Sequence, residues 1–158
     1  MIEIVCQSQF ETETVAATLA ARACAGDLFA LEGDLGAGKS TFARAFIRAA
    51  LEDANAQVPS PTFTLVQSYA ANPEIYHADL YRIHDPDEVF ELGLDEVRDS
   101  AVLLVEWPDR MPQEWQHSAL FIHFAHTYEA AGTAREGERR LRFVGNSERW
   151  QQLLKGLV

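Results

Sequence analysis

The chain has 158 residues, which is enough for one sizeable core, and we expect a single domain over residues 1–158. Hydrophobic residues make up 47% and charged residues 23%, ordinary values for a globular protein, and no apolar run approaches the length of a transmembrane helix. The formal net charge of −11 argues against direct nucleic-acid binding, because the average surface would repel a phosphate backbone.

The first ten residues lack a basic segment followed by a long apolar stretch, so no secretory signal is expected. Cys6 and Cys24 are isolated, have no metal-ligand spacing, and are expected to be buried thiols. These observations predict a soluble, cytoplasmic protein.

Strand-like and helix-like periods alternate along the chain, which favours an α/β fold. Ile2 to Cys6 is expected to form a strand, and a helix follows from about Thr12 to Cys24. The next strand runs from Asp27 to Glu32. A glycine-rich turn from Gly33 to Lys39 then leads into a helix from Ser40 to about Leu51.

Thr62 to Tyr69 and Glu74 to Ala78 are predicted to pair as antiparallel strands, because the turn sequence Ala-Ala-Asn-Pro joins them. Asp85 matches a helix N-cap, and Gly93 suits the end of that helix. The continuous apolar run Ala101 to Val105 predicts a central strand that is covered on both faces.

Leu120 to Phe124 and Leu141 to Val144 alternate as strands do. The segment Gly132 to Gly137 between them is expected to be mobile. Ser147 is placed to cap a last helix that runs through Leu154.

Residues 33–40, GDLGAGKS, fit the phosphate-binding pattern G-x-x-x-x-G-K-[ST] between a predicted strand and a predicted helix. Glycines allow successive backbone N–H groups to face one anion, at which the following helix directs its positive end. Lys39 would bridge the β- and γ-phosphates, the Ser40 hydroxyl would coordinate Mg²⁺, and Thr41 is placed to reach the α-phosphate. The candidate nucleotide ligands are Gly33, Asp34, Leu35, Gly36, Ala37, Gly38, Lys39, Ser40 and Thr41. The alternative is a flexible turn with a solvated lysine.

Two acids at the ends of predicted strands are candidates for holding the metal or orienting the attacking water. Glu106 ends the apolar strand, where a carboxylate at the carboxyl edge of a parallel sheet would face the phosphates. Asp79 follows the strand Glu74 to Ala78. Either could ligate Mg²⁺, with the other orienting water, and the sequence leaves their assignment open. A solvated carboxylate or a helix cap is the alternative for each.

Thr62 and Thr64 lie roughly twenty residues beyond Lys39, where many P-loop proteins carry a segment that senses the γ-phosphate. We interpret one of them as a switch threonine, with simple strand filling as the alternative. His77 and Trp107 are more readily explained as a hydrogen-bonded core residue and a packing residue. The other histidines show no ligand spacing, so no metal besides the nucleotide's Mg²⁺ is indicated.

Five ordered segments, GDLGAGKST (33–41), SPTFTL (60–65), YHADLYR (76–82), ELGL (91–94) and VEWPDR (105–110), closely resemble the TsaE family, also called YjeE. These are bacterial P-loop ATPases of tRNA threonylcarbamoyladenosine synthesis. The resemblance covers about Glu11 to Arg110. It implies a P-loop NTPase-like three-layer α/β sandwich, with a small mixed sheet flanked by helices.

The resemblance also implies an ATPase that acts with the TsaD–TsaB complex, which transfers threonylcarbamoyl to N6 of adenosine 37 in tRNA. Contact with tRNA would be made through those partners, with no membrane or DNA contact, and ATP and Mg²⁺ would be the cofactors. Lys39 then corresponds to a phosphate ligand, Ser40 and Glu106 to the magnesium positions and Asp79 to the acid tied to hydrolysis. Ser40 stands where threonine is usual in the family.

Trp107 and residues 62–64 correspond to nucleotide-responsive elements, and residues near Glu11 to Thr14 and Gly132 to Arg139 correspond to further nucleotide contacts. Slow turnover is expected for the isolated chain, because no arginine finger is obvious near the P-loop, Arg82 being the nearest candidate.

Two other functions remain open. A small-molecule kinase shares the loop but needs an acceptor pocket and an arginine-rich lid, for which only the late arginines Arg135, Arg139, Arg140 and Arg142 are available. A nucleotide-gated binding module would keep Lys39 and Ser40 without hydrolysis. A GTPase is disfavoured because no asparagine is followed by lysine, as a guanine-reading segment requires.

Overall fold

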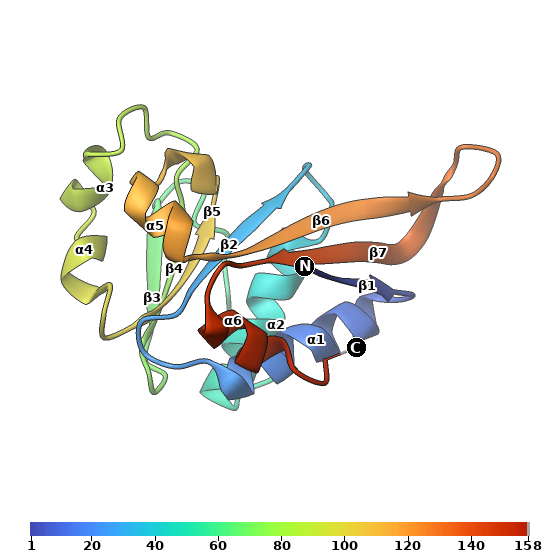
Figure 1. The fold of residues 1–158 in the computed structure, drawn as a ribbon, viewed down its shortest axis with the longest axis horizontal. Coiled ribbons are helices and arrows are strands. Elements are labelled where there is room, and N and C mark those ends of the chain that lie inside the picture. Colours follow the sequence, from blue (N-terminus) through green and yellow to red (C-terminus); the bar gives the residue numbers. More distant parts are fainter. Residues whose placement is uncertain (158) are drawn as a thin grey trace.

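The alternating segments form one mixed sheet with helices on both faces in the computed structural model, which describes residues 1–157 (Figure 1). The sheet has seven strands in the order β1-β7-β6-β2-β5-β4-β3. The strands are β1 (Ile2–Cys6), β2 (Leu28–Gly33), β3 (Val66–Tyr69), β4 (Ile75–Asp79), β5 (Val102–Glu106), β6 (Leu120–Tyr128) and β7 (Ala134–Val144). The helices are α1 (Gln9–Arg22), α2 (Lys39–Leu51), α3 (Glu88–Glu91), α4 (Leu94–Val97), the 3₁₀ helix η1 (Pro108–Arg110), α5 (Gln113–Ser118) and α6 (Glu148–Leu154).

The centre of the sheet is parallel and its edges are antiparallel. β2 pairs in parallel with both β5 and β6, and β4 pairs in parallel with β5. β3, β7 and β1 add antiparallel neighbours at the two sides. The predicted antiparallel pair and the predicted central strand are therefore confirmed, and the carboxyl ends of β2, β4 and β5 meet at one edge.

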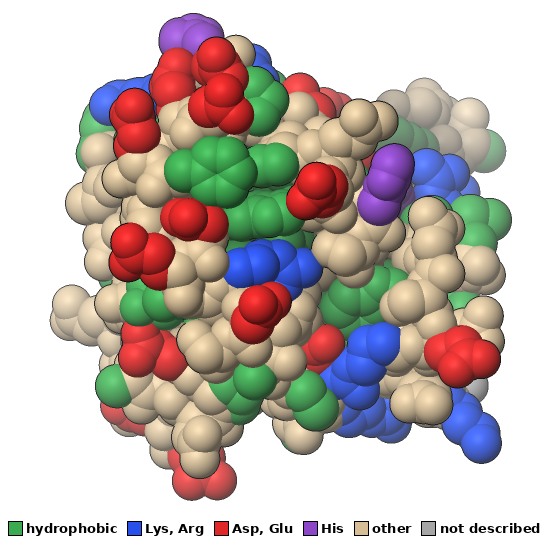
Figure 2. Space-filling view, turned by 60° about the vertical axis from the view of Figure 1, so that its left-hand side comes forward, with side chains coloured by type: hydrophobic (Ala, Val, Ile, Leu, Met, Phe, Trp, Pro, Cys, Tyr) green, Lys and Arg blue, Asp and Glu red, His purple; other side chains and the backbone are tan. Residues whose placement is uncertain are grey.

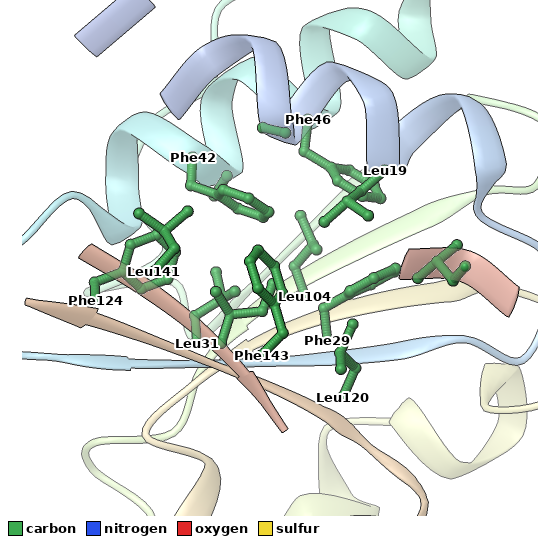
Figure 3. Packing of buried hydrophobic residues seen from close by; sticks show 14 of the residues in the cluster. Leu19, Phe29, Leu31, Phe42, Phe46, Leu104, Leu120, Phe124, Leu141 and Phe143 are labelled. Atoms are coloured by element: carbon green, nitrogen blue, oxygen red, sulfur yellow. The ribbon is translucent and has the colours of Figure 1, made fainter. Parts of the chain in front are cut away.

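Two hydrophobic cores lie on opposite faces of the sheet. Phe29 and Leu31 of β2 point to the face covered by α1, α2 and α6, whereas Leu28 and Ala30 point to the face covered by α3, α4 and α5. Alternation along a strand that is buried on both faces accounts for this division. Figure 3 shows the larger core, where Phe46 of α2 meets the ring of Phe29 at 5.2 Å between centroids. The predicted three-layer architecture is confirmed.

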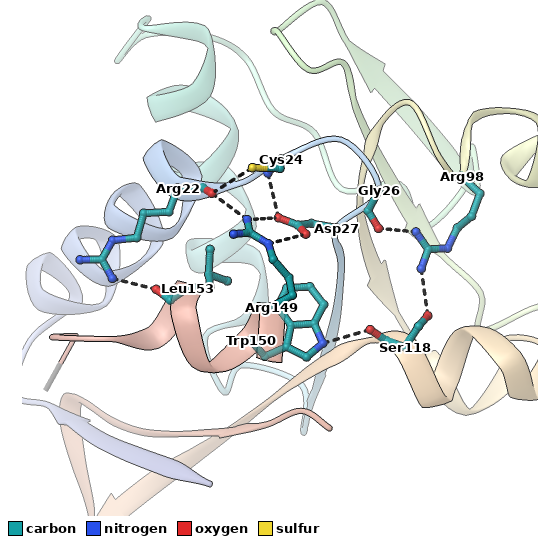
Figure 4. A network of polar contacts seen from close by, with 9 residues as sticks. All are labelled: Arg22, Cys24, Gly26, Asp27, Arg98, Ser118, Arg149, Trp150 and Leu153. Carbon is teal, nitrogen blue, oxygen red and sulfur yellow. Dashed lines mark hydrogen bonds and ion pairs between the residues drawn. The ribbon is translucent and has the colours of Figure 1, made fainter. Parts of the chain in front are cut away.

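A polar network fixes the edge of the sheet opposite the carboxyl ends of the central strands (Figure 4). Asp27, immediately before β2, accepts hydrogen bonds from Arg149 of α6 and from the N–H of Cys24. Arg149 also donates to the carbonyl of Arg22 at the end of α1. The network therefore joins α1 and α6 to the start of β2.

In the first half of the chain, two elements begin at other residues than predicted. α1 begins at Gln9 rather than near Thr12, because Ser8 caps it by accepting from the N–H of Glu11 at 3.2 Å. The expected strand Thr62 to Tyr69 begins only at Val66, because a turn closes from the N–H of Leu65 to the carbonyl of Pro61 at 2.7 Å. Cys6 is buried as predicted, but Cys24 is exposed because it lies in the loop after α1.

The later elements also show differences. The single short helix expected between Asp85 and Gly93 is α3, which begins later than expected, at Glu88, and ends before Gly93 as predicted; Gly93 has a φ of 78°, and a further short helix, α4, follows it. Asp85 organises the preceding turn, where its side chain accepts from the N–H of Asp87 at 3.0 Å. β6 and β7 extend well past the predicted strands, so most of the segment Gly132 to Gly137, which was expected to be mobile, belongs to a long hairpin (Figure 1).

The excess of acidic over basic residues is visible on the surface (Figure 2). On the side of the molecule that carries α3 and α4, acidic side chains are spread over the face rather than gathered in one place (Figure 2). Within residues 1–157, no helix is both long and apolar enough to cross a bilayer.

Candidate functional site

The glycine-rich loop connects the carboxyl end of β2 to the first turn of α2, as the motif requires. Gly36 and Gly38 have φ values of 81° and 116°, a region that favours glycine. A Cβ added at Gly33 would lie 2.7 Å from the carbonyl oxygen of Phe124, so a side chain there would displace backbone of β6. The loop therefore depends on its glycines for both turn geometry and close packing.

A hollow of about 330 Å³ opens beside this loop and collects most of the predicted site residues. The predicted site residues that line it are Leu35, Gly36, Gly38, Lys39, Ser40, Thr41, Thr62, Asp79, Glu106 and Trp107. Gly33 and Asp34 instead border an adjoining hollow of about 250 Å³, together with Lys39 and Trp107. Ala37 is buried, and Thr64 lines neither hollow among the described residues.

Lys39 reaches back over the loop. Its Nζ donates to the carbonyl oxygen of Gly33 at 2.5 Å, which holds the ammonium above the loop at the entrance to α2. An ammonium in this position gives the hollow a positive charge beside the positive end of α2. The arrangement suits an anion with several oxygens, such as a polyphosphate.

The two strand-end acids are neighbours. Asp79 and Glu106 are paired in the register of β4 and β5, and both are buried at 6% and 7% exposure. Burial raises the pKa of the Asp79 carboxyl, and the charge of Glu106 raises it further, while the hydrogen bond from the N–H of Tyr81 opposes the rise. Asp79 therefore holds a proton more readily than an exposed aspartate does.

Glu106 has a buried partner in His77. Nε2 of His77 lies 2.9 Å from Oε2 of Glu106, and His77 is only 3% exposed. The sequence interpretation of His77 as a hydrogen-bonded core residue is confirmed, and its bond runs to the candidate metal ligand.

The two candidate switch threonines lie in different surroundings. The hydroxyl of Thr62 lies 2.7 Å from Ser60 Oγ and 3.4 Å from Asp79 Oδ2. The hydroxyl of Thr64 accepts from the side chain of Gln67 at 2.8 Å. Thr62 is thus the one in contact with a candidate acid. Neither lies in a strand, so the alternative that they fill a strand is wrong.

Trp107 borders both hollows instead of packing in the core. It has a φ of 58° and is 46% exposed, because the chain turns sharply after β5 into η1. The guanidinium of Arg110 lies 5.6 Å from the centroid of its ring. The expectation that Trp107 is a simple packing residue is therefore wrong.

The hollow also contains Ser60 and Tyr81, which the sequence did not single out as ligands, and Arg139, the last residue of the segment 132–139 that the resemblance links with nucleotide contacts. Ser60 and Tyr81 belong to two of the segments that carry the family resemblance, so their closeness to the site could have been predicted from those segments. Arg139 approaches from β7, where only the loose correspondence of residues 132–139 pointed to it. Arg82 is not among the lining residues; its guanidinium lies over the rings of Phe63 and Tyr81.

The donor set of the hollow fits magnesium with a polyphosphate. Mg²⁺ prefers hard oxygen ligands, uses one or two carboxylates, and takes its remaining ligands from phosphate and water. The hydroxyl of Ser40 and the carboxylate of Glu106 line the same space and provide this chemistry. Within residues 1–157 no group of three or more histidine, cysteine, aspartate or glutamate side chains is placed to hold a metal ion alone.

Comparison with known proteins gives consistent results. The family model described as "Threonylcarbamoyl adenosine biosynthesis protein TsaE" matches residues 6–136. Proteins named tRNA threonylcarbamoyladenosine biosynthesis protein TsaE are 43% identical over 103 residues in Rickettsia conorii and 36% identical over 149 residues in Bacillus subtilis. The first alignment covers 65% of this chain and 58% of its relative, and the second covers 93% and 87%.

The chain thus spans less than two thirds of the Rickettsia conorii relative. Among solved structures, the crystal structure of Bacillus subtilis YdiB matches with a TM-score of 0.75 and 28% identity, covering 99% of this chain and 93% of that one. The matched family model covers most of the chain, including the P-loop and both acids, and this chain therefore belongs to the TsaE family of tRNA threonylcarbamoyladenosine biosynthesis.

Proposed function

We propose that this protein binds and hydrolyses ATP with Mg²⁺ and that it acts with the TsaD–TsaB complex in forming threonylcarbamoyladenosine at position 37 of tRNA. One observation carries the proposal: Asp79 and Glu106, paired in register, line the same hollow as Lys39 and Ser40. A phosphate loop alone supports binding, and two buried acids facing it support chemistry on the bound phosphates.

Phosphate binding is assigned to the loop and to α2. The backbone N–H groups between Leu35 and Thr41 and the ammonium of Lys39 would hold the triphosphate, and Lys39 would exchange the Gly33 carbonyl for phosphate oxygen. The hydroxyl of Ser40 would coordinate Mg²⁺ as the hydroxyl of the threonine usual at this position would, since both side chains offer one oxygen to the metal.

The two acids take different roles in this proposal. Glu106, whose carboxylate is held by His77, would be a ligand of Mg²⁺, and the bound ion would neutralise charge on the transferring phosphoryl group. Asp79 orients the attacking water. Its raised pKa makes it a stronger base than an exposed aspartate. The hydroxyl of Thr62, which lies 3.4 Å from Asp79, would respond to the γ-phosphate.

The mouth of the hollow supports a protein partner. Leu35, Trp107 and Tyr81 line the hollow and are 100%, 46% and 36% exposed. Apolar side chains gathered around a polar site are typical of an interface. A partner seated here would exclude water from the phosphates, so we expect slow hydrolysis by the isolated chain and faster hydrolysis with TsaD–TsaB.

The test compares ATP turnover by the purified protein alone and with TsaD–TsaB, for the wild type, Lys39→Ala, Asp79→Ala and Glu106→Ala. Turnover should rise with the partners and be lost in all three variants, and modification of tRNA should be lost with it. Full turnover by the isolated chain would contradict the partner dependence. If Asp79→Ala and Glu106→Ala support modification as the wild type does, the protein is a nucleotide-gated binding module.

A nucleotide-dependent pull-down separates the kinase alternative. The wild type should associate with TsaD–TsaB in the presence of ATP, and Lys39→Ala should lose the nucleotide effect. No association with or without ATP would favour a kinase that acts on a small-molecule acceptor.

A further inference from the structure

We propose that Arg110 is a positioning residue for ATP hydrolysis: its guanidinium joins the two turns that follow Asp79 and Glu106, and so holds Trp107 and both acids in place at the hollow. The inference rests on the proposed function, because it assumes that the two acids act on a bound nucleotide. Arg110 lines neither of the two hollows in the described part of the chain, so it acts through other residues.

A tight turn follows each of the two strands that end in an acid. After β4, the N–H of Ile83 donates to the carbonyl of Leu80 at 2.9 Å. After β5, the N–H of Arg110 donates to the carbonyl of Trp107 at 3.1 Å, and this turn forms the 3₁₀ helix η1. The first turn therefore ends at Ile83 and the second at Arg110.

The side chain of Arg110 connects these two turns. Its Nη1 donates to the carbonyl oxygen of Ile83, a buried residue. Its guanidinium lies 5.6 Å from the centroid of the Trp107 ring, within the range of a cation–π contact. The ion pair with Asp109 is long, at 3.6 Å, and exposed, so it contributes little. The guanidinium thus contacts the end of one turn and the start of the other.

Trp107 needs this support because its backbone is strained. Its φ of 58° lies in the left-handed region, which a non-glycine residue keeps only when surrounding contacts fix it. Its ring also lies 6.5 Å from that of Tyr81, whose N–H donates to Oδ1 of Asp79 at 3.1 Å. Movement of Trp107 would therefore reach Glu106, its neighbour in the chain, and Asp79 through Tyr81.

The position of Arg110 indicates which step of the reaction it supports. A small misplacement of the groups that orient a reacting water can cost about a hundredfold in rate. The phosphate loop, which would hold the nucleotide, makes none of the contacts described for Arg110. Loss of Arg110 should therefore lower kcat and leave nucleotide affinity nearly unchanged.

The experiment measures kcat and KM for ATP with TsaD–TsaB present, and the affinity of the chain alone for Mg·ADP. Arg110→Gln should lower kcat about tenfold to a hundredfold and change KM and Mg·ADP affinity by less than about twofold. Arg110→Lys keeps a cation near Trp107 and should lose less of kcat. Thermal unfolding checks that each variant is folded, and if Arg110→Gln is not, Arg110→Lys carries the test.

Arg98→Gln is the matched control. The guanidinium of Arg98 likewise lies 5.7 Å from the centroid of a tryptophan ring, that of Trp115, and it donates to a carbonyl, that of Gly26, at 2.5 Å. These contacts lie at the edge of the sheet opposite the carboxyl ends of the central strands (Figure 4). Arg98→Gln therefore removes the same kinds of contact far from the hollow and should leave kcat unchanged.

Fluorescence quenching tests the link between Arg110 and Trp107 without turnover. In the protein without nucleotide, acrylamide should quench tryptophan emission more strongly in Arg110→Gln than in the wild type, because the guanidinium no longer covers the ring of Trp107. Adding Trp107→Phe should abolish this increase, since Trp115 and Trp150 are buried in the cores.

The other outcomes each overturn the proposal. Wild-type kcat in Arg110→Gln would show that the arginine has no positioning role, and a raised KM at unchanged kcat would make it a binding residue. An equal loss of kcat in Arg98→Gln would reduce the effect to general stability. Failure of the wild type to hydrolyse ATP with TsaD–TsaB would refute the proposed function itself, and unchanged quenching in Arg110→Gln would then refute its support of Trp107 as well.

Discussion

His77 and Glu106 are joined side chain to side chain across the parallel strands β4 and β5, with Nε2 and Oε2 2.9 Å apart and both residues buried. A proton carried on Nε2 of His77 would be donated to this carboxylate oxygen. The bond fixes the direction of Glu106 within the hollow and satisfies it where little water reaches.

Replacing His77 should therefore affect both stability and the metal requirement. His77→Leu leaves the buried carboxylate of Glu106 unpaired, which should lower the free energy of unfolding by about 1–3 kcal/mol and raise the Mg²⁺ concentration for half-maximal ATP turnover. His77→Gln retains a side-chain N–H donor and should lose less of both. Urea unfolding measures the free energy of unfolding, and turnover at increasing Mg²⁺ concentrations measures the metal requirement. Equal losses in the two variants would show that the hydrogen bond is unimportant.

Lys39 should matter for nucleotide affinity and not for folding. Its contact in the structure is a single bond to the carbonyl of Gly33, so Lys39→Ala should change the free energy of unfolding by no more than about 0.5 kcal/mol. Loss of the ammonium from the phosphates should weaken ATP binding about a hundredfold. Lys155, the chain's other lysine, provides a control of identical charge on exposed surface, and Lys155→Ala should bind as the wild type does.

Trp107 should report nucleotide binding by fluorescence. It is 46% exposed and borders the hollow, whereas Trp115 and Trp150 are 8% and 4% exposed in the cores. ATP should therefore change the emission of Trp107 alone, and Trp107→Phe should abolish the change while leaving the fold intact. A nucleotide-dependent signal that persists in Trp107→Phe would place the responsive tryptophan elsewhere.

Asp79 predicts a specific pH dependence of stability. Because its pKa is raised in the folded protein above the ordinary value of 3.8, the unfolded chain releases this proton first as the pH rises. The free energy of unfolding of the wild type should therefore fall relative to that of Asp79→Asn as the pH rises from below 3.8 through the raised folded pKa. Above that pKa the deficit should stay constant.

Urea unfolding of the two proteins at pH values on both sides of that window tests this prediction. Nucleotide affinity of Asp79→Asn should be close to that of the wild type, since Asp79 is assigned to the attacking water and not to phosphate. A stability difference that does not change with pH would mean that the carboxyl of Asp79 titrates normally in the folded protein.

The parts of the fold that were predicted correctly depend on short-range patterns. The phosphate loop, the flanking strand β2 and helix α2, and the central strand β5 follow from glycine spacing and from a continuous apolar run. Residues 62–65 were wrongly assigned to a strand, because their alternation fits a strand although a turn closes at Leu65. Local periodicity cannot distinguish these cases without the neighbouring strand.

The residues of the candidate site were likewise only partly predictable from local sequence patterns. Asp79 and Glu106 were found because each ends a recognisable strand, and a parallel sheet brings such ends together. Arg139 lies 103 residues from Gly36 in the chain and reaches it only because β7 folds back beside β6, a pairing that the lengths of the predicted strands did not reveal. Local periodicity does not predict a contact that depends on strand order, and only the family resemblance pointed to this part of the chain.

The ion pair between Arg149 and Asp27 should stabilise the fold without affecting nucleotide binding, because it lies at the opposite end of β2 from the phosphate loop (Figure 4). Two bonds of 3.0 and 2.6 Å join the guanidinium to the carboxylate, and Asp27 is only 5% exposed. Arg149→Ala leaves that carboxylate with only the N–H of Cys24, so we expect a loss of about 1.5–3 kcal/mol in the free energy of unfolding. A double-mutant cycle with Asp27→Asn, measured by urea unfolding, separates the pair from the packing of Arg149. Additive losses would show that the pair itself contributes nothing, and a parallel loss of ATP affinity would show that the two ends of β2 are coupled.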